Sequence, residues 1–158
     1  MTDNSFKVLI ADDDAPTRML VSAAIKQWGY LPVETVDGEA AWEILQKTDA
    51  PKLLILDWLM PKLDGIALCS RIKETIPNRP YIILLTQLTG TTNVVKALEA
   101  GADEFLSKPF NMAELRSRLS IGARIIRYET TLSEISRQLK EAQDTIKKLQ
   151  SDPNNKTS

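Results

Sequence analysis

The chain has 158 residues, of which 43% are hydrophobic and 26% charged, an ordinary globular composition long enough for one well-packed domain. A formal net charge of −1 argues against a general basic surface for nucleic acid, and no apolar run reaches membrane-spanning length. The absence of histidine excludes Ser-His and Cys-His catalysis and histidine-bound metals, and the single cysteine, Cys69, excludes an internal disulfide. The N-terminus is polar, unlike a signal peptide. We therefore expect a cytoplasmic protein that binds neither nucleic acid nor membrane.

Short apolar segments alternate with amphipathic ones along the first 120 residues. In chain order we expect a strand at 7–11, a helix at 15–28, a strand at 33–36, a helix from 37, a strand at 53–56, a helix at 66–76, a strand at 81–85, a helix at 92–100, a strand at 104–107 and a helix from 111. Strands this apolar are usually covered on both faces. The alternation predicts an α/β fold with a doubly wound, five-stranded parallel sheet.

Residues at the ends of these segments support the helix boundaries. Asp14 and Asp37 precede helices as N-caps, and Asn111 begins a capping box with Glu114. Glycines stop two of the helices, at 29 and 101. We expect Asp64-Gly65 to form a turn rather than to take part in chemistry.

Polar side chains follow four of the five predicted strands. Asp12 and Asp13 follow the first strand, Asp57 the third, Thr86 the fourth and Lys108 the fifth. In parallel sheets ligands bind beyond the carboxyl ends of the strands. Three crowded carboxylates with neither His nor Cys favour Mg²⁺, with Mn²⁺ as an alternative. A carboxylate nucleophile, a hard cation, a lysine and a hydroxyl are the parts needed to transfer a phosphoryl group to aspartate.

Residues 5–121 resemble the receiver domains of two-component response regulators. The acidic pair lies in Leu-Ile-Ala-Asp-Asp-Asp, and Asp57 lies in Leu-Ile-Leu-Asp-Trp-Leu-Met-Pro-Lys-Leu-Asp-Gly. Thr86 ends Ile-Leu-Leu-Thr, and Lys108 lies in Ser-Lys-Pro-Phe, shortly after Phe105. Each motif alone would be weak, but together they are specific. The resemblance implies a flavodoxin-like sheet with strand order 2-1-3-4-5.

The resemblance also implies roles for these residues. Asp57 is the phosphoacceptor, supported by Thr86 and Lys108. Asp13, Asp57 and the backbone carbonyl of Leu59 bind Mg²⁺ directly, and Asp12 contributes through water. The phosphoryl donor is a histidine kinase or a histidine phosphotransfer protein.

The resemblance further implies how the domain responds. On phosphorylation Thr86 moves toward the phosphoryl group and Phe105 turns inward, which remodels the face formed by the fourth helix, fifth strand and fifth helix. Leu59 and Leu88 occupy the positions that flank the route of the water attacking the acyl phosphate. One residue departs from the family pattern: the position after the switch threonine is usually small, and here it is Gln87, which we expect to narrow access to Asp57.

Beyond Gly122 the pattern becomes a heptad repeat. Apolar residues alternate at spacings of three and four over nearly four heptads: Ile125, Tyr128, Leu132, Ile135, Leu139, Ala142, Ile146 and Leu149. We predict a parallel homodimeric coiled coil, with a receiver domain at 1–122, the helical extension at 123–150 and a disordered tail at 151–158. We expect Gly122, at the junction, to be the point of flexing. The alternative is that the stripe packs back onto its own receiver domain.

Three functional classes compete. The first is a phosphoacceptor signalling module, which is not an enzyme; it either acts alone or precedes an output enzyme such as a diguanylate cyclase or a phosphatase. The second is a phosphatase of the haloacid dehalogenase type, but its Asp-x-Asp-x-Thr signature would start at Asp12 and the fifth position is Pro16. The third, a DNA-binding regulator, lacks a basic patch and room for a helix-turn-helix.

Overall fold

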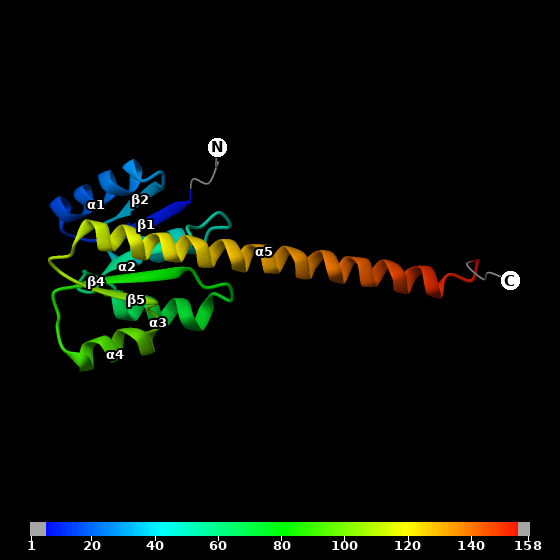
Figure 1. Cartoon of the computed structure of the whole chain (residues 1–158). Coiled ribbons are helices and arrows are strands. Elements are labelled where there is room, and N and C mark those ends of the chain that lie inside the picture. The colour runs from blue at the N-terminus through cyan, green and yellow to red at the C-terminus, as the bar shows by residue number, and fades with distance from the viewer. Residues whose placement is uncertain (1–5, 155–158) are drawn as a thin grey trace. The chain divides into compact units, whose positions relative to one another are not determined.

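The computed structural model describes residues 6–154, which divide into two compact units, one through Arg124 and one from Ile125. Strands and helices alternate along the chain (Figure 1): β1 Lys7–Ala11, α1 Ala15–Gln27, β2 Leu31–Thr35, α2 Gly38–Leu45, β3 Leu53–Asp57, α3 Gly65–Thr75, β4 Tyr81–Thr86, α4 Thr91–Ala100, β5 Glu104–Ser107 and α5 Met112–Ser151. Within residues 6–154, no helix is both long enough and apolar enough to cross a bilayer.

The sheet of the first unit is parallel throughout and has the order β2-β1-β3-β4-β5, as predicted. Every residue of β3 and β4 is buried, so both faces of the central strands are covered. Residues of α2, α3 and α4 form one core cluster with alternate strand residues such as Leu54 and Leu84. α1 and the first turns of α5 lie on the other face (Figure 1).

The helix caps follow the local sequence. Asp14 accepts a hydrogen bond from the Thr17 backbone N–H, and Asp37 accepts one from that of Ala40, as expected of N-caps. Asp64 does more than form a turn, because it caps α3 by accepting from the Ala67 N–H at 2.7 Å.

β2 differs from its predicted position, since it covers Leu31–Thr35 rather than 33–36. Pro32 argues against a strand when the sequence is considered alone, because proline cannot donate a ladder hydrogen bond. β2 lies at the edge of the sheet, where proline is tolerated, and its parallel pairing with β1 sets the bounds.

α5 continues unbroken through Gly122 to Ser151. A Cβ atom at Gly122 would lie 2.4 Å from Cδ1 of Tyr81 on β4, so this glycine serves close packing of helix on sheet, a role that the flexing prediction did not anticipate. The predicted disordered tail is wrong at Ser151, which is helical, and its residues 155–158 lie outside the described part of the chain. All eight residues of the heptad stripe are exposed.

Candidate phosphoacceptor site

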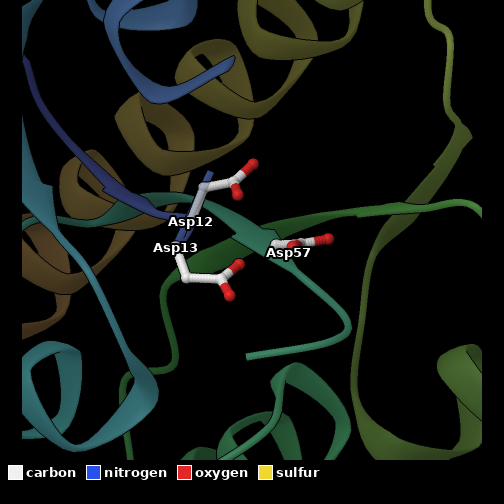
Figure 2. A group of neighbouring side chains, drawn as sticks. All are labelled: Asp12, Asp13 and Asp57. Atoms are coloured by element: carbon white, nitrogen blue, oxygen red, sulfur yellow. The ribbon is translucent and has the colours of Figure 1, made fainter. Parts of the chain in front are cut away.

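Three aspartates meet at the carboxyl ends of adjacent strands β1 and β3 (Figure 2). Their carboxylates offer oxygens that all lie within 4.8 Å of one another. Asp12 is 2% exposed and Asp57 is 8% exposed, whereas Asp13 is exposed to solvent. Such an all-oxygen cluster, open on one side and buried on the other, has the donor chemistry of a site for a hard divalent cation.

Lys108 joins this cluster from the segment after β5. Its Nζ lies 3.1 Å from Oδ2 of Asp12 and 3.2 Å from Oδ1 of Asp57, and its side chain is 13% exposed. The Lys108 backbone N–H donates to the carbonyl of Thr86 at 2.7 Å, which fixes the segment to the end of β4. The ammonium is therefore held in place by the backbone as well as by the two carboxylates it contacts.

The protonation of the cluster reflects burial and crowding. Burial raises the pKa of Asp57 to about 6, the charge of Asp12 raises it further, and Lys108 acts in the opposite direction. Burial also disfavours the charged form of Lys108, but its bonds to Asp12 and the charge of Asp57 outweigh burial and raise the pKa of the ammonium. One ammonium against three carboxylates leaves an excess of negative charge, which a divalent cation would balance.

Backbone contacts fix Asp12. The Asp14 N–H donates to Oδ1 of Asp12 at 2.9 Å, and a guanidinium nitrogen of Arg18 donates to the Asp12 carbonyl at 2.8 Å. Arg18 also lies 3.4 Å from a carboxylate oxygen of Glu34 on β2. Sequence reasoning did not single out Arg18, because a lone arginine on an amphipathic helix carries no signal of its own.

The two predicted switch residues lie away from solvent to different degrees. Thr86 is 1% exposed, and its hydroxyl oxygen accepts a hydrogen bond from the Leu88 N–H at 2.9 Å. Phe105 is partly buried and packs against the core cluster that α2, α3 and α4 share with the sheet. The Thr86 hydroxyl is thus bound to the loop that follows β4.

Side chains that border the site differ in exposure. Gln87 is exposed and shares with Lys108 the lining of an open pocket of about 620 Å³. Leu59, the predicted source of a backbone ligand, has a side chain that is 57% exposed, whereas Leu88 is partly buried. Trp58, next to Asp57, is only 5% exposed, and its ring centroid lies 6.0 Å from Nζ of Lys96 on α4.

Comparisons with known proteins agree with this geometry. A family model described as the response regulator receiver domain matches residues 8–120. The chain is 36% identical over 115 residues to the probable transcriptional regulator ycf27 of Porphyridium aerugineum, which covers 72% of this chain and 46% of that protein. It is 36% identical over 114 residues to the response regulator RppA of Synechocystis sp., which covers 72% of this chain and 48% of that protein. The chain thus spans about half the length of these relatives.

A solved structure shows the same architecture. The receiver domain of the Francisella response regulator 1452 superposes with a TM-score of 0.70 at 30% identity, covering 76% of this chain and 98% of that one. The family match spans most of the chain, and the acidic cluster and Lys108 lie together at the carboxyl ends of its strands. This chain belongs to the family of response regulator receiver domains, which are signalling modules rather than enzymes.

Proposed function

We propose that Asp57 accepts a phosphoryl group from a phosphohistidine of a histidine kinase or a histidine phosphotransfer protein. The observation that carries the proposal is the Lys108 ammonium, which contacts Asp57 inside a cluster of acids. An Asp57 carboxylate oxygen attacks phosphorus in line, an O–P bond forms, and the P–N bond of the donor breaks with its electron pair returning to the imidazole. Lys108 stabilises the charge on the phosphoryl oxygens.

Asp12, Asp13, Asp57 and the Leu59 carbonyl are the groups that would hold a divalent cation, with Mg²⁺ favoured over Mn²⁺. When bound, the cation supplies positive charge to the oxygens of the transferring phosphoryl group. The protein's own contribution is to aim Asp57 at the phosphorus atom and to place Lys108 beside the transferred group. The Thr86 hydroxyl donates to a phosphoryl oxygen once it moves toward the site.

The signal leaves the site through Thr86 and Phe105. In the described state the Thr86 hydroxyl is bonded to the loop after β4, so movement toward a phosphoryl group pulls on that loop. The space that Thr86 leaves lets Phe105 turn inward, and the face formed by α4, β5 and α5 changes. An output domain or a separate partner reads this change.

The stripe on α5 supports a second part of the proposal, a homodimer formed through the C-terminal helix. Leu132 and Leu139 are 67% and 59% exposed, which leaves them wet in a single chain. Arg137 pairs with Glu134 and Glu141 of its own helix, away from the stripe, so these charges are satisfied within one chain. A second copy that covers the stripe is the simplest partner, because the positions flanking it carry few charges.

The test of the phosphoacceptor is mass spectrometry after incubation with acetyl phosphate and Mg²⁺. The parent should gain one phosphoryl group and Asp57→Asn none, whereas Asp14→Asn, which keeps the helix cap, should be labelled like the parent. Unchanged labelling of Asp57→Asn would overturn the assignment. Steady turnover of a generic phosphate ester, in place of one stoichiometric acyl phosphate, would favour the phosphatase.

The test of the cation site is a Mg²⁺ titration followed by fluorescence. Trp58 adjoins Asp57, so its emission should change as Mg²⁺ binds. Asp13→Asn removes one carboxylate ligand and should weaken binding by about tenfold or more. If Asp13→Asn titrates like the parent, the cation binds elsewhere.

A further inference from the structure

The loop between β3 and α3, residues 58–64, is closed at both ends by backbone hydrogen bonds. The Trp58 N–H donates to the Leu85 carbonyl at 2.9 Å, and the Gly65 N–H donates to the Trp58 carbonyl at 2.8 Å. This loop contains Leu59, whose carbonyl is a proposed cation ligand. Its path therefore decides where one ligand of the cation lies.

A strained turn lies in the middle of the loop. The Leu63 N–H donates to the Pro61 carbonyl at 2.8 Å across Lys62, whose φ is 68°. This combination is a γ-turn of the rare class in which the central residue has positive φ. A lysine adopts that conformation only when its surroundings hold it there.

The start of α2 supplies those surroundings. Nζ of Lys62 lies 3.5 Å from Oδ2 of Asp37, whose side chain is only 9% exposed and caps α2. A Cβ atom at Gly38 would lie 2.0 Å from the carbonyl oxygen of Leu63 and 2.8 Å from its Cβ. The loop can follow this path only because position 38 has no side chain.

We infer that Asp37 and Gly38 are positioning residues for the cation site. They hold Lys62 and Leu63 in place, and through them the loop that carries the Leu59 carbonyl. Mg²⁺ demands near-ideal ligand geometry, so a small displacement of one ligand costs affinity. The inference rests on the proposed function, because it concerns the cation that the phosphoacceptor site would bind.

The experiment is the Mg²⁺ titration of the full chain by Trp58 fluorescence, with the unfolding midpoint measured without Mg²⁺. Asp37→Asn keeps the cap, because asparagine caps helices as well as aspartate does. Combined with Lys62→Met it removes the ion pair at constant net charge, so the general field at the site is preserved. The matched control is Lys7→Met with Asp49→Asn, which removes another exposed ion pair at constant net charge.

The double variant at Asp37 and Lys62 should bind Mg²⁺ about two- to fivefold more weakly, the range expected for an exposed ion pair. Gly38→Ala should bind it about tenfold more weakly, because the loop backbone must move. Saturating Mg²⁺ should restore the parental phosphorylation rate in both, since only the binding of the cation is impaired. The control pair should titrate like the parent.

Parental Mg²⁺ affinity in the double variant would overturn the inference and leave the proposed function intact. If Gly38→Ala fails to fold, the double variant still decides the matter. A parent chain that neither responds to Mg²⁺ nor forms an acyl phosphate would overturn the proposed function itself.

Discussion

The Lys108 ammonium lies 3.2 Å from the carboxylate of Asp57, the residue that carries the proposed chemistry. Lys108→Met should slow phosphorylation by acetyl phosphate about ten- to a hundredfold, because the phosphoryl oxygens lose their fixed positive charge. Lys26→Met, on the exposed surface of α1, is the control for loss of one positive charge. The measurement is the initial rate of acyl-phosphate formation by mass spectrometry, and equal rates in parent and Lys108→Met would remove the lysine from the mechanism.

The raised pKa of Asp57 predicts how stability depends on pH when Mg²⁺ is chelated. The folded state binds the Asp57 proton more tightly than the unfolded state, since the pKa rises from 3.8 to about 6 on folding. The contribution of this group to the free energy of unfolding should therefore fall as pH rises from about 4 to about 6. Asp57→Asn should lose that part of the slope. Denaturant unfolding of both proteins at pH 4, 5, 6 and 7 is the measurement, and parallel curves would contradict the prediction.

The acyl phosphate should decay slowly. Leu59 and Leu88, which resemblance places beside the route of the attacking water, can neither orient nor hydrogen-bond it. Polar substitutions at both positions, such as Leu59→Asn with Leu88→Gln, should speed decay at least severalfold. The time course of acyl-phosphate loss after removal of the donor is the measurement. Decay at the parental rate would show that these apolar side chains are not what limits hydrolysis.

The heptad stripe should hold two chains together. Leu132→Asp with Leu139→Asp places charge in the interface and should abolish pairing, whereas Thr130→Asp with Ser133→Asp adds the same charge off the stripe. Sedimentation of each protein, with and without beryllofluoride as a phosphoryl mimic, is the measurement. A parent that stays monomeric in both states at tens of micromolar would refute the coiled coil.

Gly122→Ala should destabilise the protein, although the same change in an open helix stabilises it by about 1 kcal/mol. The new methyl would meet the Tyr81 ring at 2.4 Å, and overpacking of this kind costs about 1–3 kcal/mol. Adding Tyr81→Ala should remove the clash, so the double variant should lose less stability than the two single losses combined. Thermal unfolding of the four proteins gives the coupling, and simple additivity would show that the contact does not matter.

The sequence predicted the sheet and the position of the acidic cluster because both depend on local signals. Apolar runs give the strands, and the carboxyl ends of parallel strands must lie at one edge. β2 was displaced because Pro32 reads as a break until its edge position is known. The strained turn at Lys62 and the contact of Gly122 with Tyr81 depend on residues far apart in the sequence, which leave no local pattern.

The unbroken course of α5 from Met112 to Ser151 has a consequence for protein engineering. Each residue inserted after Gly122 turns whatever follows by about 100°, because the helix has about 3.6 residues per turn. Seven inserted residues come within about 20° of the original phase, whereas three or four reverse the arrangement of alternate turns only slightly and two place it on the opposite side. Any domain fused to the end of this helix would therefore depend on linker length with a helical period, and chimeras should be built in steps of seven.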